Sequence, residues 1–597
     1  MPPPGVLFLL GVLPPISLAA IAVYVTTHLL RSYFEIYVPA AVSILTFLLL
    51  YPSYKAAAIA WDVHSQKREA AAMGAVEVPL WEAKWPGGLD LLLLIAKKIE
   101  NGYPGEVFNW PLQHVGQIFR FRAFWVNQIF TSDPEHMKTI LAIDFNKFEK
   151  GKWFTETLSA MLGTGVLNSD GEMWKFHRTM TRPFFTRDRT SHFDIFERHS
   201  DEAILQMTTR LNEDCAIDFQ DVIWRFTLDS ATEFLFGSCV HSLSDGLPYP
   251  HFHPKSKSAS SDNDNRSLSF ASALEEAMYV VSRRARIGPI WPLLEIFNDK
   301  SRRSMKVIER FLDPIIRHAL ERKRLMVGDG EGREKSGEIG DDETLLDHLV
   351  KSTEDMSILK DEVINMMIAG RDTTATTLTY AFYFLALHPH VLERLRGEIL
   401  ANVGHSRRPT FDDIREMKYL RAVINETLRL FPPVPFNLRT SINATTLPAL
   451  KPGAKPFYIP ALTNVTYSVF TMHRRTDLWG PDAQEFDPDR FIDSRLNKYL
   501  TPNPAIFQPF SIGPRICLGQ QFAYNEASFM LVRLLQRFDG ITLDSAAQPP
   551  DSRPPPEWVL AEGRQAKEQV WPKSHITMYS HKGLWLRLRA ASRENEP

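Results

Sequence analysis

The distribution of apolar residues divides the chain into a short N-terminal part and a much longer main part. Residues 6–30 carry no charged side chain, and a helix of that length, rising about 1.5 Å per residue, can cross a bilayer core of about 30 Å. A second apolar run follows at residues 36–51. The pattern predicts a membrane anchor over residues 1–62, with one or two transmembrane helices, ahead of a main domain over residues 63–597. A cleaved signal peptide is disfavoured, because no basic segment precedes the first run and the run is longer than the usual apolar region of a signal peptide.

Beyond residue 62 the pattern changes from continuous to periodic. Apolar and charged side chains alternate over Phe119, Arg120, Phe121 and Arg122, which predicts short strands around a turn. From about residue 133 onward most segments have helical periodicity. Two polar inserts, at 242–269 and 328–343, are predicted to be mobile surface loops. The fold class expected is one large, mainly α-helical domain with small β-sheets.

Composition narrows the possible functions. A formal net charge of -2 over 597 residues gives no electrostatic reason to expect a nucleic-acid partner. The three cysteines, at 215, 239 and 517, are far apart and odd in number, which argues against a disulfide framework and against a paired-cysteine metal site. The folded part is therefore expected in a reducing compartment. No glycine-rich nucleotide loop lies between a strand and a helix, so the chain contains no dinucleotide-binding module of its own.

The stretch PFSIGPRICLGQQ at residues 509–521 carries the strongest chemical signal. Cys517 lies between Gly513 and Gly519 and just ahead of an apolar run with helical spacing. A helix N-terminus favours thiolate over thiol, and glycines let the backbone approach a flat, bulky group closely. A nucleophilic cysteine would need a nearby base, and none stands out locally. A lone thiolate can instead hold a haem iron axially, whereas the remaining alternative is a buried structural cysteine.

The spacing F-x-x-G-x-R-x-C-x-G resembles the signature of the cytochrome P450 family. Phe510, Gly513, Arg515, Cys517 and Gly519 meet it in order. The resemblance implies haem b (iron protoporphyrin IX) with Cys517 as its axial thiolate ligand, shielded by Phe510, and with Arg515 near a haem propionate. Because the chain lacks CxxCH, the haem is expected to be bound without covalent attachment.

A second motif, NETLRLFPPVP, supports the resemblance. Glu426 and Arg429 are three residues apart, so they share a helix face and can pair. The motif is similar to the family's E-x-x-R helix, and FDPDRF downstream supplies Arg490 as a third member. The resemblance implies a structural network of these three residues behind the haem. Asp489 stands where the family more often has Glu.

A third motif, AGRDTTA, lies within a long apolar helical stretch. The hydroxyl groups of Thr373 and of the neighbouring threonines can bond to backbone carbonyls and loosen the helix. This would open a groove for O₂ and water. The motif is similar to the family's A/G-G-x-D/E-T-T/S pattern. It implies that Asp372 and Thr373 deliver protons during O₂ activation. A kinked core helix without chemistry is the alternative.

Four further residues are expected to contact the haem propionates. Trp174 and Arg178, one helical turn apart, resemble the family's W-x-x-x-R helix, and both side chains can donate to a carboxylate. Arg439 and His473 occupy positions where the family often has additional propionate contacts. For the last two, a surface location is the alternative.

Together the motifs predict a membrane-bound haem-thiolate monooxygenase that hydroxylates a lipophilic small molecule with O₂. The apolar segments after residues 150–165, before Gly370 and around 431–441 are expected to line the substrate pocket. The sequence most resembles fungal alkane and fatty-acid hydroxylases. An oxidation in fungal secondary metabolism, on a terpenoid or polyketide, is an equal alternative. A haem-thiolate isomerase or dehydratase that needs no O₂, and a haem-binding sensor or carrier, are alternatives of other classes.

The resemblance also implies partners and location. Electrons are expected from NADPH-cytochrome P450 reductase, because the chain has no flavin or NADPH module. The anchor predicts the endoplasmic reticulum membrane, with the catalytic domain facing the cytosol.

Overall fold

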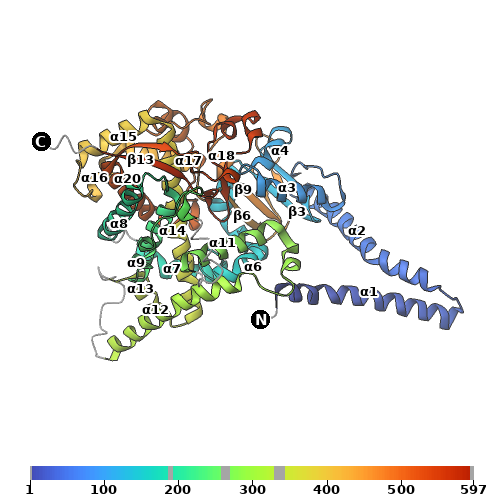
Figure 1. The fold of residues 1–597 in the computed structure, drawn as a ribbon. Helices are drawn as coiled ribbons and strands as arrows, with labels where there is room; N and C mark the ends of the chain where they lie inside the picture. The colour runs from blue at the N-terminus through green and yellow to red at the C-terminus, as the bar shows by residue number, and fades with distance from the viewer. Residues whose placement is uncertain (1–2, 186–192, 257–268, 329–342, 592–597) are drawn as a thin grey trace.

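The computed structural model describes residues 3–185, 193–256, 269–328 and 343–591 (Figure 1). Two N-terminal helices, α1 (Pro4–Phe34) and α2 (Ala40–Ala72), extend side by side from the main body and run in opposite directions. α1 is long and apolar enough to cross a membrane, and α2 begins with a shorter apolar stretch, Ala40–Leu50. α2 continues without interruption through residue 62, so the expected domain boundary lies inside a helix.

The last turns of α2 belong structurally to the main body. The Tyr458 hydroxyl bonds to the Glu69 carboxylate, and Ala70 and Ala75 pack on the ring of Tyr458. Directly after the helix, β1 pairs with β8. The anchor is therefore joined to the body by a packed helix end and a strand rather than by a free linker.

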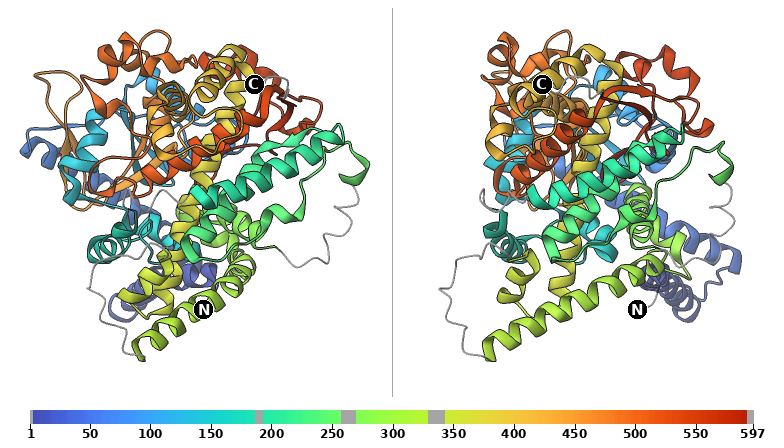
Figure 2. Two further views of the ribbon diagram at one scale, coloured as in Figure 1. Left: turned by 90° about the vertical axis from the view of Figure 1, so that its left-hand side faces the viewer. Right: turned by 60° about the vertical axis from the view of Figure 1, so that its left-hand side comes forward.

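Helices make up most of the main body (Figures 1 and 2). The longest of its buried helices, α14 (Met356–Leu387), packs against α9, α17 and α20. Its apolar residues are distributed around its whole circumference, as expected for a helix that is covered on all sides. The Asp355 carboxylate caps its first turn, and Pro389 follows its end. The other helices are α3 (Leu89–Asn101), α4 (Asn109–His114), α5 (Pro134–Lys138), α6 (Gly151–Leu162), α7 (Gly171–Thr181), α8 (Phe193–Asn212), α9 (Phe219–Phe236), α11 (Phe270–Ile287), α12 (Arg302–Gly328), α13 (Leu345–Ser352), α15 (Pro389–Asn402), α16 (Phe411–Glu416), α17 (Lys418–Leu430), α18 (Val469–Met472), α19 (Thr476–Trp479) and α20 (Gln520–Arg537).

Within the described residues the strands form four small sheets. The largest has the order β2-β3-β9-β6-β4, and its antiparallel β2–β3 hairpin contains the alternating Phe119 to Arg122 segment. The remaining sheets are β1-β8-β7, β10-β13-β5 and β11-β12. The bounds are β1 (Val76–Glu77), β2 (Ile118–Ala123), β3 (Val126–Thr131), β4 (Phe148–Glu149), β5 (Ile217–Asp218), β6 (Phe436–Ser441), β7 (Thr445–Leu447), β8 (Phe457–Ile459), β9 (Asn464–Ser468), β10 (Phe538–Leu543), β11 (Pro572–Ser574), β12 (Met578–Ser580) and β13 (Trp585–Ala590).

The predicted fold class is confirmed: the domain is mainly α-helical, with small sheets. Of the two polar inserts, residues 257–268 and 329–342 lie outside the described residues, so the structure does not address their expected mobility.

A buried ion pair holds the C-terminal half of the body together. Arg429 donates two hydrogen bonds to Glu426, of 2.7 and 2.8 Å, and both side chains are fully buried on α17. The guanidinium of Arg429 also donates to the carbonyls of His473, Ala483 and Glu485. Arg490 approaches Glu426 to 3.6 Å. A helix is thereby fixed to an irregular segment some 50 residues away in sequence, with the charges paired as burial requires.

We predict that Glu426→Ala lowers the free energy of unfolding by about 3–5 kcal/mol, because it leaves Arg429 charged and unpaired in the core. The measurement is the denaturant midpoint of the purified full chain. Arg394→Ala is the matched control, because it breaks an exposed pair with Asp489 and should cost at most about 1 kcal/mol. Equal losses in the two variants would contradict the structural role of the buried pair.

Candidate functional site

The chemically interesting residues surround a cavity of about 310 Å³ beside α14. Cys517 lies on its wall, three residues before the start of α20 at Gln520. The segment before it folds into a short 3-10 helix, η12 (Gly513–Arg515), and the Cys517 N–H donates to the carbonyl of Phe510. This closed loop places the sulfur between the cavity and the helix N-terminus.

Gly513 is required by the geometry of this loop. Its φ of 73° lies in the left-handed region, and a Cβ there would lie 2.0 Å from the Leu141 carbonyl oxygen. Gly519 is different, since its φ is −84° and an added Cβ would have only Phe185 nearby, at 3.9 Å. A left-handed φ therefore requires glycine at Gly513 and not at Gly519, where the missing side chain instead leaves the cavity wall open.

The Cys517 thiol is exposed to the cavity but lies deep within the fold. Burial raises its pKa, while the Gly519 N–H and the Arg178 charge act in the opposite direction. Arg178 on α7 also donates to the carbonyl of Ile516, at 2.7 Å, and the Ile516 side chain is 40% exposed. Both Ile516 and Cys517 line the cavity, and Arg178 fixes the backbone between them.

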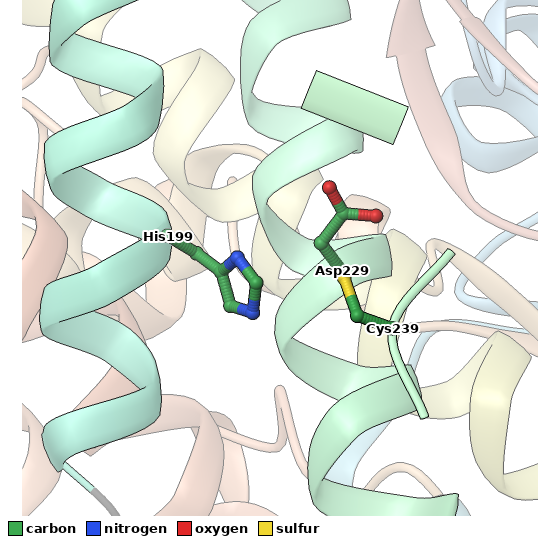
Figure 3. A group of neighbouring side chains, drawn as sticks. All are labelled: His199, Asp229 and Cys239. Atoms are coloured by element: carbon green, nitrogen blue, oxygen red, sulfur yellow. The ribbon is translucent and has the colours of Figure 1, made fainter. Parts of the chain in front are cut away.

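The other two cysteines have different surroundings. Cys215 is buried beside a backbone carbonyl. Cys239 lies near His199 and Asp229, and ligand atoms of the three are within 4.8 Å of one another (Figure 3). Burial together with the nearby carboxylates raises the pKa of Cys239 to about 12, and Asp229 already accepts three hydrogen bonds from Ser242 and Leu243. We therefore interpret this group as a structural cluster that holds a loop against α9.

Four cationic side chains line one part of the Cys517 cavity: Lys150, Arg178, Arg439 and Arg515. One nearby carboxylate, Asp170, binds Arg515 at 2.6 Å and also accepts the backbone N–H groups of Lys150 and Gly151. Burial and the charges of Arg439 and Arg515 hold the pKa of Lys150 well below its usual range. Burial and Arg439 likewise lower the pKa of Arg515 to about 10. The cluster has an excess of positive charge that an anionic group in the cavity would neutralise.

Trp174 lies at the same place. It is buried on α7 and stacks against Arg515, whose guanidinium carbon is 4.5 Å from the ring centroid. Trp174, Arg178, Arg439 and Arg515, all singled out by the motifs, therefore lie together. Sequence reasoning missed Lys150, because nothing in the local sequence FEKGKW distinguishes this lysine from a surface lysine.

His473 corrects one expectation. It does not line the cavity but is fully buried, with one ring nitrogen facing the Arg429 carbonyl at 3.2 Å and the other accepting from the Gln508 N–H at 3.0 Å. Burial and Arg429 lower its pKa to about 3, so the ring is neutral. Both nitrogens are used within the core, and His473 has no free donor for a carboxylate in the cavity.

α14 passes the cavity with the Gly370 and Thr373 side of the helix facing it. It remains one α-helix through the motif, and the Thr373 hydroxyl donates to the Ala369 carbonyl at 2.7 Å. Asp372 is turned away from the cavity and pairs with Arg371 at 3.1 Å. Burial raises the pKa of Asp372 to about 6, and its second carboxyl oxygen has no hydrogen-bond partner among the described residues. The structure thus separates the two residues that the motif was expected to bring to one groove.

The rest of the wall is apolar. Val166 and Leu167 follow α6, Met366 and Ile368 precede Gly370, and Val434 follows α17, so each of the three expected pocket segments contributes. Phe510 and Tyr524 both line the cavity, with ring centroids 5.1 Å apart. A flat, apolar group with carboxylates at one edge fits this combination of thiol, apolar wall and cationic edge. These are the properties of haem, so the residues present fit that cofactor.

Comparison with known proteins agrees with this chemistry. The family model described as Cytochrome P450 matches residues 86–565. The chain is 36% identical to Cytochrome P450 52A3-A of Candida maltosa over 435 residues, which cover 71% of this chain and 77% of that protein. It is 35% identical to Cytochrome P450 monooxygenase g430 of Fusarium sp over 475 residues, which cover 78% and 79% of the two chains. It is also 35% identical to Cytochrome P450 52A6 of Candida tropicalis over 524 residues, which cover 85% and 90%.

Proposed function

Because this chain belongs to the cytochrome P450 family, whose members bind haem through a cysteine thiolate, we propose that Cys517 is the axial ligand in a membrane-anchored monooxygenase. The observation that carries the proposal is that Cys517 shares one cavity with the under-paired cations Lys150, Arg178, Arg439 and Arg515. Bound haem supplies the activation of O₂, with one oxygen atom inserted into the substrate and the other reduced to water by two electrons and two protons.

The chain's own residues bind and orient the cofactor. The N-terminus of α20 and Arg178 favour the thiolate form of Cys517. The cationic edge of the cavity, with the Trp174 N–H, can hold the two propionates by charge-assisted hydrogen bonds. Phe510 covers the sulfur side. These groups come from α7, α20 and the strand segment around Arg439, so cofactor binding joins parts of the chain that are distant in sequence.

Thr373 and Asp372 are proposed to control protons. The Thr373 hydroxyl lies on the cavity wall, where it can pass a proton to oxygen in the cavity and recover one from water. Asp372, with a pKa near 6, can hold a proton close to neutral pH, and rotation away from Arg371 would bring it towards Thr373. The apolar wall excludes other water from the reaction.

A lipophilic substrate follows from the same wall. We propose a hydrocarbon chain, an alkane or a fatty acid, as the substrate class, in keeping with the fungal hydroxylases that the sequence resembles. A terpenoid or polyketide in secondary metabolism is the second candidate, because some fungal members of similar sequence serve such pathways. An isomerase or dehydratase is less well supported, since Asp372 and Thr373 are both present; product formation without any oxygen uptake would favour it.

The electron donor proposed is NADPH-cytochrome P450 reductase, since the chain has no nucleotide-binding module. The proposed location is the endoplasmic reticulum membrane, held by α1, with the body in the cytosol. The length and apolar composition of α1 support the membrane anchoring in this proposal.

The carbon monoxide difference spectrum of reduced membranes that contain the chain tests the cofactor assignment. The unmodified protein should give the strongly red-shifted Soret band of a thiolate-ligated haem, and Cys517→Ala should abolish that band. Cys239→Ser is the matched control and should leave it unchanged. A red-shifted band that survives Cys517→Ala would refute Cys517 as the ligand.

We predict that Thr373→Ala keeps the spectrum but lowers the product formed per NADPH by about tenfold, because electrons are diverted to hydrogen peroxide when protons arrive at the wrong place. The measurement compares NADPH consumed, peroxide released and product formed. Thr377→Ala, which removes a hydroxyl one turn along the cavity wall, is the control and should retain coupling. Unchanged coupling in Thr373→Ala would remove the proton-delivery role.

Product analysis separates the two substrate classes. Incubation of the reconstituted enzyme with dodecanoate should yield hydroxylated dodecanoate, because the apolar cavity accepts a methylene chain. A panel of terpenes under the same conditions is the comparison. If a terpene were converted and dodecanoate were not, the proposed substrate class would be wrong and the enzyme would be assigned to secondary metabolism.

A further inference from the structure

A second and larger cavity, of about 720 Å³, lies between α11 and α12 and is closed at one end by the 3-10 helix η8 (Gly288–Glu295). Its base is rigid. Arg284 donates two hydrogen bonds to Glu295, of 3.0 and 2.7 Å, and one of 2.7 Å to Asp299. The same guanidinium stacks on Trp291, 4.5 Å from the ring centroid. Two of the three carboxylates on the cavity wall, Glu295 and Asp299, are therefore already paired with Arg284.

The remaining wall is strongly cationic. Apart from Arg284, six cationic side chains face the cavity, against the single remaining carboxylate, Glu276, which accepts a hydrogen bond from Ser304. None of the six forms a salt bridge with a carboxylate in the described parts of the chain. They are Arg283, Lys300, Arg302, Arg303, Lys306 and Arg310. Such a concentration of unpaired positive charge in a concave wall attracts an anion.

The first turn of α1 lies beside this cavity. A Cβ on Gly5, in the first turn of α1, would lie 2.4 Å from the Ile296 Cα and 2.6 Å from the Pro292 carbonyl oxygen, so α1 begins in direct contact with the segment that closes the cavity. Both views of Figure 2 show the first turns of α12 close to this end of α1. In the same segment Leu294 is 52% exposed and Phe297 90% exposed. Apolar side chains and basic side chains thus lie together at the base of α1.

We propose that this cavity binds the headgroup of an anionic phospholipid from the membrane that α1 enters. The basic side chains of the wall can bind the phosphate of the headgroup, together with a second negative charge or a polar group that it carries. Ile287, Leu294 and Phe297 offer an apolar surface for the first part of the acyl chains. The bound lipid would fix the orientation of the body on the membrane surface. The inference rests on the proposed anchoring by α1 and is independent of the haem chemistry at Cys517.

The test uses the full chain purified in an uncharged detergent. Native mass spectrometry measures the binding of dihexanoyl phosphatidylglycerol, dihexanoyl phosphatidylcholine and inorganic phosphate over a range of concentrations. Arg303→Glu with Arg310→Glu reverses two charges on the cavity wall. Arg317→Glu with Arg324→Glu is the matched control, because both residues are exposed on the same helix, have the same spacing and lie outside the cavity.

The expected result is that one phosphatidylglycerol binds at a concentration about tenfold lower than phosphatidylcholine does. The cavity variant should lose this preference, and the control should keep it. Equal binding of the two lipids, or equal loss of preference in both variants, would overturn the proposal. Displacement of the lipid by an equal concentration of inorganic phosphate would also overturn it and would assign the cavity to a soluble anion. The carbon monoxide spectrum of the same samples separates this outcome from a failure of the haem assignment, since neither double variant touches the haem cavity.

Discussion

The buried pairing of Glu426 with Arg429 is the interaction on which the arrangement of the site depends. Arg429 reaches the backbone of the segment that contains His473, and the His473 ring continues the connection to the N–H of Gln508. Gln508 begins the loop that carries Cys517. Two buried charges and one neutral imidazole therefore link α17 to the cysteine loop through direct hydrogen bonds.

Cationic side chains with a structural role differ from those in the proposed cofactor site in how much carboxylate charge lies at hydrogen-bond distance. Arg429 and Arg284 are buried with carboxylates at hydrogen-bond distance and hold segments together. Lys150, Arg439 and Arg515 are buried with much less counter-charge, in a cavity that fits an anionic cofactor. Burial of a charge without a partner is unfavourable by several kcal/mol, so a fold that retains such a cluster has a ligand to compensate it. The basic cavity at the base of α1 follows from a different argument, because its cations are exposed and attract an anion without a burial cost.

Much of the fold and the site could be predicted from the sequence, because several motifs occur in order and each depends on local spacing. The helix with Glu426 and Arg429, the cysteine loop and the β2–β3 hairpin need only short-range pattern recognition. His473 was expected at a propionate, whereas its ring bonds to Arg429 and Gln508, which are distant from it in sequence. Lys150 was missed for the same reason, since the charges that mark it, Arg439 and Arg515, meet it only in three dimensions. The boundary at residue 62 was drawn where hydropathy changes, whereas the backbone of α2 continues to Ala72.

The cationic edge of the haem cavity makes the stability of this protein depend on its cofactor. Without an anion the like charges of Lys150, Arg439 and Arg515 repel one another, which weakens the contacts among β6, α7 and the cysteine loop. A ligand that binds the folded chain and not the unfolded one shifts the folding equilibrium in proportion to the logarithm of its free concentration. The folded fraction of newly made chains therefore rises with the cell's supply of haem, and chains made during haem shortage are exposed to proteolysis. The amount of enzyme in the membrane follows cofactor synthesis as well as gene expression.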